Sequence, residues 1–93
     1  MLISESAEAH IEADHAVTFP EVLEAADNRG LLFPTRWGRS ALLGVTDAGR
    51  LLRVILAPDE SDTGLWWVIT ALDASDRDRR TWTRQSRRHP RRS

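Results

Sequence analysis

Three apolar runs of strand length between residues 39 and 72 constrain the fold more than any other part of the sequence. The first follows Arg39, the second spans 51–57 and the third spans 65–72, with turn-forming residues between them. Short apolar runs separated by such turns are typical of an antiparallel β-meander. The second run is interrupted only by Arg53, so we expect it in the middle of a sheet that is covered on both faces. Residues 31–36 are compatible with a fourth strand, which Pro34 would confine to a sheet edge.

Helices are predicted on both sides of this meander. Residues 5–15 are good helix formers, and the next helix begins at a capping box formed by Thr18 and Glu21. A second capping-box pattern, Ser75 to Asp78, begins a C-terminal helix. The prediction is therefore an α+β fold with two N-terminal helices, a three- to four-stranded antiparallel meander and a C-terminal helix. It forms one domain over residues 1–86, and 87–93 is a basic tail that we expect to be disordered.

The net charge of −1 conceals a strong separation of charge along the chain. Residues 1–28 contain seven acidic and no basic residues, whereas residues 79–93 contain seven arginines and no acidic residue. Two interpretations remain open: the basic end binds an anionic partner, such as a nucleic acid, or the two ends neutralise each other in the fold. The chain has no cysteine, no transmembrane run and no signal-peptide pattern, so we expect a cytoplasmic protein that does not insert into membranes.

The sequence gives little support for metal or nucleotide chemistry. His10 and His15 are five residues apart, which does not place two ligands on one helix face, so no metal site is expected. Phosphate-binding glycine loops and nucleophile motifs are absent. Arginine and tryptophan are instead interleaved, at residues 36–39 and 80–84. This mixture suits RNA, because arginine binds phosphate while tryptophan stacks on bases. The alternative is that the tryptophans are core or dimer residues.

The order of several motifs resembles the BrnT-type toxins. Residues 15–19 (His-Ala-Val-Thr-Phe) resemble the family's His-Gly-Val-Ser/Thr-Phe opening, and residues 38–50 resemble its Gly-Arg hairpin. Residues 69–71 (Ile-Thr-Ala) and the Arg-rich segment 76–80 resemble its Ile-Ser/Thr-Ala-Arg segment and the helix that follows. The acidic segment 1–12 stands where the family has an N-terminal strand, and we expect no strand there.

The resemblance implies a RelE-like fold and a metal-independent endoribonuclease, the toxin of a type II toxin–antitoxin system, with no cofactor. It implies RNA and a small DNA-binding antitoxin as partners; a homodimer is an open possibility. The candidate catalytic residues are His15, Arg39, Arg77 and Arg80. The candidate RNA-binding residues are Arg36, Trp37, Arg53, Trp82 and Arg84.

Two features of the sequence keep other interpretations open. Leu72 stands where the family usually has an arginine after Ile-Ser/Thr-Ala, so the alternative is a degenerate homologue that acts as a protein- or nucleic-acid-binding module. His15 has an alternative role as a residue that caps carbonyls at a helix C-terminus. A third hypothesis is a nucleic-acid binder that acts through its arginine-rich tail.

Overall fold

The computed structural model describes the backbone of residues 1–88 and the side chains of residues 1–85. Its elements, in chain order, are β1 (Leu2–Ile3), α1 (Glu5–His15), α2 (Phe19–Asp27), β2 (Leu31–Pro34), β3 (Ser40–Val45), β4 (Leu51–Pro58), β5 (Trp66–Asp73) and α3 (Asp76–Arg88). The predicted tail begins inside α3, because this helix continues through Arg87 and Arg88. The remainder of that tail lies outside the described residues.

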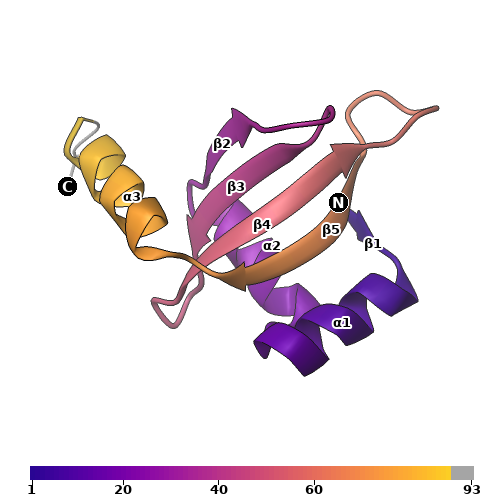
Figure 1. The fold of residues 1–93 in the computed structure, drawn as a ribbon, viewed down its shortest axis with the longest axis horizontal. Helices are drawn as coiled ribbons and strands as arrows, with labels where there is room; N and C mark the ends of the chain where they lie inside the picture. Colours follow the sequence, from indigo (N-terminus) through magenta and orange to yellow (C-terminus); the bar gives the residue numbers. More distant parts are fainter. Residues whose placement is uncertain (89–93) are drawn as a thin grey trace.

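The strands form one mixed sheet with the order β1-β5-β4-β3-β2 (Figure 1). Strands β2 to β5 form the predicted antiparallel meander, with β2 at an edge and β4 in the centre. The α+β class with three helices is therefore confirmed. The strand count is corrected to five, because β1 pairs in parallel with β5. The expectation that residues 1–12 contain no strand was wrong: two paired residues, Leu2 and Ile3, are too few to show a period in the sequence.

Helices α1 and α2 pack on one face of the sheet and form the hydrophobic core with it. The core residues are Ile11, Val17, Val22, Ala25, Leu42, Leu52, Val54, Leu56, Val68 and Ala71. The predicted capping box begins α2, because Glu21 N donates to Thr18 Oγ1 over 3.3 Å and Thr18 N donates to Glu21 Oε1 over 3.0 Å. Helix α2 approaches β3 so closely that a Cβ at Gly44 would collide with the carbonyl of Ala25. The absence of a side chain at position 44 therefore sets the spacing between helix and sheet.

The opposite face of the sheet, which we call the open face, carries the side chains that alternate with the core residues. Register places Leu43 of β3 beside Arg53 of β4, and Arg53 beside Leu72 of β5. Along β4, Leu52, Val54 and Leu56 on the core face are buried. On the other face Leu51 is also buried, whereas Arg53, Ile55 and Ala57 are half-buried. Strand β4 is therefore fully covered on its core face and only partly covered on the other, which corrects the expectation of full cover on both faces. Most outward-facing residues of β4 are apolar as well, so its sequence does not show the apolar–polar alternation that usually marks a strand with one exposed face.

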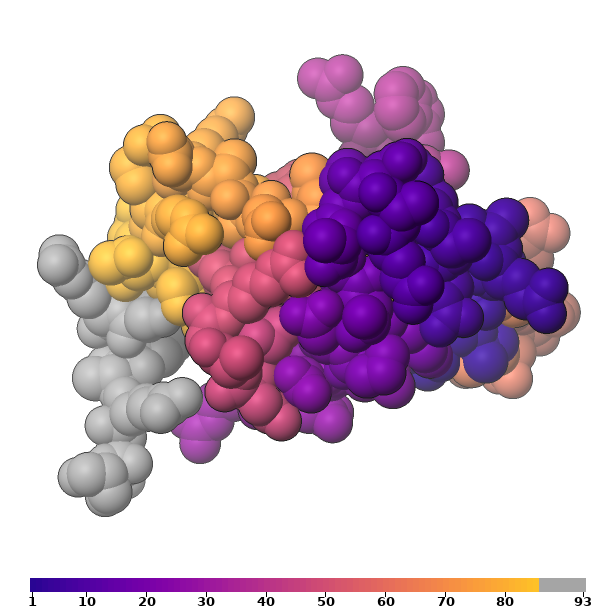
Figure 2. Space-filling model, turned by 90° about the horizontal axis from the view of Figure 1, so that it is seen from below, coloured from indigo at the N-terminus to yellow at the C-terminus, as the bar shows by residue number. Residues whose placement is uncertain are grey.

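Helix α3 leaves the end of β5 and projects to one side of the sheet (Figure 1). Seen from below, α1 and α2 cover the middle of the molecule and α3 lies at one end (Figure 2). The core cluster contains no residue of the described part of α3. Helix α3 is thus attached to the sheet by different contacts from those that hold α1 and α2. Within the described residues, no helix is both long and apolar enough to cross a membrane.

Candidate functional site

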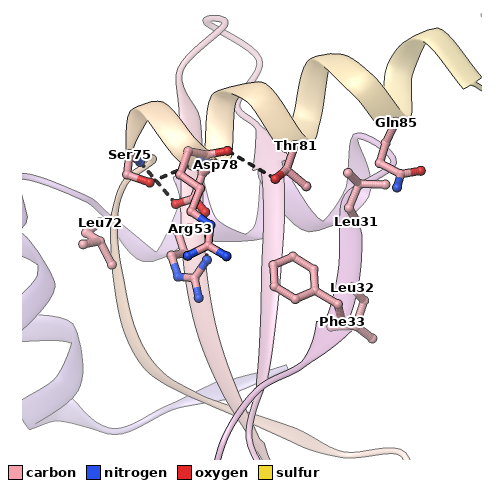
Figure 3. A pocket seen from close by; sticks show the side chains of 10 residues that line it. Leu31, Leu32, Phe33, Arg53, Leu72, Ser75, Asp78, Thr81 and Gln85 are labelled. Atoms are coloured by element: carbon pink, nitrogen blue, oxygen red, sulfur yellow. Dashed lines mark hydrogen bonds and ion pairs between the residues drawn. The ribbon is translucent and has the colours of Figure 1, made fainter.

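A cavity of about 800 Å³ lies between α3 and the open face of the sheet (Figure 3). We call it the α3 pocket. Its lining residues are Leu31, Leu32, Phe33, Arg53, Leu72, Ser75, Arg77, Asp78, Thr81 and Gln85. Strands β2, β4 and β5 provide one wall, and α3 with the residue before it provides the other. Segments that are far apart in the sequence therefore meet in this pocket.

An ion pair between Arg53 and Asp78 joins the two walls of the α3 pocket. Arg53 Nη1 lies 2.8 Å from Asp78 Oδ1, and Asp78 is only 7% exposed. Asp78 also completes the predicted capping box, since its backbone N donates to Ser75 Oγ over 3.1 Å and its Oδ2 accepts from Ser75 N over 3.2 Å. One carboxylate thus begins α3 and attaches it to the sheet. Removing one partner of such a half-buried pair leaves the other charge without compensation.

The pocket combines positive charge with apolar walls. The Arg53 guanidinium lies 5.7 Å from the centroid of the Phe33 ring, within the range of a cation–π contact. Arg77 lines the same cavity and is exposed, and no ion pair of Arg77 occurs among the described side chains. Two guanidinium groups and one carboxylate, that of Asp78, therefore belong to the lining of this pocket. Leu72 lies directly beside Arg53 and contributes an apolar surface. Such a pocket suits an anion that also carries a flat apolar group.

His15 lies on the other side of the sheet from this pocket. It is the last residue of α1, which covers the core face, and its ring lies 5.3 Å from that of His10. His15 also acts electrostatically on Asp73, the residue after Leu72. Neighbouring residues of a strand point to opposite faces, so Leu72 belongs to the α3 pocket whereas Asp73 belongs to the side of His15. The structure therefore separates the candidate base or acid from the two arginines in the pocket.

Arg50 is the residue that holds the end of α1 in place. It donates from Nη2 to the carbonyl of His15 over 3.1 Å and from Nη1 to that of Ala16 over 2.7 Å. Its Nε lies 2.7 Å from Asp73 Oδ1, and its Nη1 lies 3.3 Å from Glu21 Oε2. The carbonyls of Ala16 and His15 at the end of α1 therefore accept hydrogen bonds from an arginine that lies 34 and 35 positions later in the chain, respectively. Arg50 was not among the predicted functional residues, because no local sequence pattern indicates a contact between residues so far apart in the chain.

The same contacts change the acid–base behaviour of two carboxylates. Hydrogen bonding from Arg50 holds the pKa of Asp73 below its usual range, and the charges of Arg79 and His15 act in the same direction. The backbone N–H of Thr18 is the main cause of the lowered pKa of Glu21, and Arg50 adds to it. A carboxylate with a lowered pKa stabilises the fold above its ordinary pKa, and this contribution disappears as the pH falls through the pKa in the folded state.

We expect Arg50→Met to lower the free energy of unfolding at pH 7 by about 2 kcal/mol, because several charge-assisted hydrogen bonds are lost together. We also expect that lowering the pH below about 4.5, the ordinary pKa of a glutamate, destabilises the Arg50→Met protein less than it destabilises the unmodified protein. Urea unfolding at pH 7 and pH 3 measures both effects. Arg29→Met, which removes an exposed arginine, is the control and should stay within about 0.5 kcal/mol. An Arg50 variant with unchanged stability and pH dependence would contradict this role.

The remaining candidate residues lie outside the α3 pocket. Arg36, Trp37 and Arg39 belong to the turn between β2 and β3, where Trp37 is 86% exposed. Pro34 pairs with Ser40, Ser40 with Leu56 and Leu56 with Val68, so this turn lies at the end of the sheet where β5 begins. Helix α3 follows the other end of β5, far from the turn along that strand. On α3, three candidates do not line the pocket: exposed Arg80, exposed Arg84 and half-buried Trp82.

Of the nine candidate residues, the structure brings Arg53 and Arg77 together in the pocket. Sequence reasoning did not identify Phe33, Asp78 or Gln85 as parts of a site. Asp78 was recognised only as a helix-capping residue, and Phe33 only as a residue of an edge strand. Their meeting depends on strand register and on the docking of α3. Within the described residues, no group of three His, Cys, Asp or Glu side chains is arranged to hold a metal ion.

Comparison with known proteins supports the fold. No family model matches this sequence, and no curated protein sequence matches it significantly. The crystal structure of the ribonuclease toxin BrnT from Brucella abortus has a similar fold, with a TM-score of 0.65 and 22% sequence identity. The alignment covers 82% of this chain and 96% of that one. The predicted BrnT-like fold is therefore confirmed.

Proposed function

We propose that this protein is a metal-independent endoribonuclease that acts as the toxin of a toxin–antitoxin system. The observation that carries the proposal is the α3 pocket, where Arg53 and Arg77 line one cavity on a BrnT-like fold. Two guanidinium groups in a partly enclosed site match the charge and geometry of a phosphodiester. The fold similarity to a ribonuclease toxin supports the choice of RNA as the ligand.

In the proposed reaction, the ribose 2′-hydroxyl attacks the adjacent phosphate and the 5′-oxygen leaves. The protein must provide a base for the hydroxyl, cations for the charge that develops on the phosphorane, and an acid for the leaving oxygen. Arg53 and Arg77 are the proposed cations. Within the described contacts, Arg53 uses only Nη1 for Asp78, so its other N–H groups remain to bind a phosphate oxygen.

His15 is the candidate for proton transfer that the sequence suggests. Since it lies on the core side of β5, it cannot transfer a proton at the phosphate that Arg53 and Arg77 are proposed to hold, so its part in cleavage is tested separately. The His15→Ala substitution distinguishes the two roles of His15. If His15 is catalytic, the substitution lowers cleavage and leaves stability unchanged. If His15 only ends α1, the substitution lowers neither.

The other candidate residues, Arg36, Trp37, Arg39, Arg80, Trp82 and Arg84, are proposed to contact flanking nucleotides. A small DNA-binding antitoxin is the proposed protein partner, and the cytoplasm the proposed location.

Incubation of the purified protein with a labelled single-stranded RNA tests the proposal. We expect cleavage that persists in EDTA and leaves 2′,3′-cyclic phosphate ends, because the 2′-hydroxyl is the nucleophile. A matched oligonucleotide with deoxyribose at the cleaved position should remain intact. RNA that stays intact over prolonged incubation, together with unimpaired growth of bacteria that express the protein, would overturn the ribonuclease proposal.

A second function, an RNA-binding module without cleavage, is favoured by one observation. Leu72 provides an apolar surface beside Arg53, and Asp78 already pairs with that arginine. The pocket therefore has less free positive charge than the number of its arginines suggests. In this case the protein should bind single-stranded RNA with Arg53 and Arg77, while the RNA remains uncut.

A further inference from the structure

The lining of the α3 pocket is divided into three chemically different parts. Leu31, Phe33 and Leu72 of the sheet form an apolar wall. Thr81 and Gln85, one helical turn apart on α3, form a polar row on the opposite side (Figure 3). The arginines described above supply the positive charge. A phosphate alone would not require the apolar wall, and an apolar ligand would not require the arginines.

We infer that the α3 pocket binds one unpaired nucleotide of single-stranded RNA, with its base against Phe33 and its polar edge toward Gln85 and Thr81. This inference deepens the proposed function, on which it rests. A nucleobase has flat apolar faces and a hydrogen-bonding edge, and its phosphate is an anion, so all three parts of the lining find a counterpart. In duplex RNA the bases are stacked and paired, so only an unpaired nucleotide can enter.

The size and the existing contacts of the pocket agree with this occupant. A cavity of about 800 Å³ lies within the usual range of small-molecule sites. The Arg53 guanidinium now lies 5.7 Å from the Phe33 ring centroid, in the space that a stacked base would use. Binding would therefore turn this guanidinium away from the ring and toward the phosphate. Figure 3 shows the Phe33 and Arg53 side chains next to each other on the sheet wall of the cavity.

The polar row indicates how the base would be read. Thr81 Oγ1 donates to the carbonyl of Arg77 over 3.2 Å, so the hydroxyl faces a ligand as an acceptor. The Gln85 amide offers a donor and an acceptor that can pair with a base edge in two bonds. We therefore expect Gln85 to determine which base the pocket prefers and Phe33 to determine how tightly any base is held.

Fluorescence anisotropy with a labelled, fully 2′-O-methylated single-stranded RNA tests the inference without cleavage. Because Phe33→Leu removes the aromatic face on which the base would stack, it should raise Kd about tenfold. Phe33→Trp retains an aromatic face and should stay within about twofold of the unmodified protein, which shows that the pocket folds normally. A duplex of the same sequence should bind equally to all three proteins, because its bases cannot enter the pocket.

Base selection is tested with four oligonucleotides that differ at one position. Gln85→Leu should reduce the differences in Kd among the four bases, because the amide that reads the base edge is gone. Thr81→Val should weaken binding of the preferred base, whereas Thr83→Val, on the exposed side of α3, is the matched control and should change nothing.

The outcomes separate this inference from the ribonuclease proposal. Suppose that RNA is cleaved normally but Phe33→Leu and Gln85→Leu change neither Kd nor base preference. This result would overturn the nucleotide pocket and leave the ribonuclease proposal standing. Binding that depends on Phe33 and Gln85 without any cleavage would support the pocket and contradict the ribonuclease. Equal effects of Phe33→Leu on duplex and single-stranded RNA would also overturn the inference, since the base would then not be the group that Phe33 contacts.

Discussion

Replacing Arg77 or Arg53 with glutamine is expected to lower the rate of RNA cleavage by a factor of about 10²–10³. This is the usual cost of removing one preorganised donor that stabilises charge in a transition state. Arg77→Gln is the cleaner variant, because no ion pair of Arg77 occurs among the described side chains. Arg53→Gln leaves the buried Asp78 without its partner and should also lower stability. Single-turnover cleavage of a labelled RNA measures the rate, and thermal unfolding of each variant separates the two effects.

Arg29→Gln is the matched control for this experiment. It removes the same charge from an exposed arginine in the turn after α2, and Arg29 does not line the α3 pocket. Its cleavage rate should stay within about twofold of the unmodified protein, since an exposed charge outside the pocket is screened by salt and does not contact the reacting phosphate. Equal losses in Arg29→Gln and Arg77→Gln would indicate that only the total charge matters, which would contradict a phosphate site in the pocket.

Introducing an arginine at position 72 is expected to raise RNA cleavage by a factor of about 10². Leu72 is half-buried, lines the pocket and pairs with Arg53 across β4 and β5. An arginine there can lay its methylene groups along the apolar wall while its guanidinium reaches the cavity. It would add a cation where Asp78 now offsets the charge of Arg53, and one such donor is worth about 3 kcal/mol in a transition state.

Leu72→Gln distinguishes charge from polarity in this experiment. Glutamine is polar and of comparable length, but it cannot stabilise a phosphorane as a cation can. We expect Leu72→Gln to leave the rate unchanged and Leu72→Arg to raise it, as measured by single-turnover cleavage. A Leu72→Arg protein that folds normally but cleaves no faster would show that position 72 does not limit activity.

The fold was largely predictable because its signals are local. The strand runs between residues 39 and 72 and both capping boxes are visible within short windows of sequence, and each appears in the structure. Strand β1 was missed because its two residues show no periodicity and its stability comes from pairing with β5, at the other end of the sequence. The exposure of β4 was misjudged because apolar residues occupy both of its faces.

The site was less predictable because it depends on contacts between distant segments. Arg53 and Arg77 were identified as candidates from residue type and resemblance, but their convergence requires the register of β4 with β5 and the docking of α3 through Asp78. Phe33 joins them from the edge strand, and no window of sequence shows that it faces Arg53. His15 was grouped with these arginines, although the sheet places it on the opposite side of β5.

The most direct test of the account is an NMR titration with a short, fully 2′-O-methylated single-stranded RNA. We propose that RNA binds in the pocket between α3 and the open face of the sheet. We predict the largest shift changes at Phe33, Arg53, Arg77, Thr81 and Gln85, with contacts between the Phe33 ring protons and a base. Shift changes confined to the turn at residues 35–39 or to the His15 end of α1, or no changes at all, would contradict the claim.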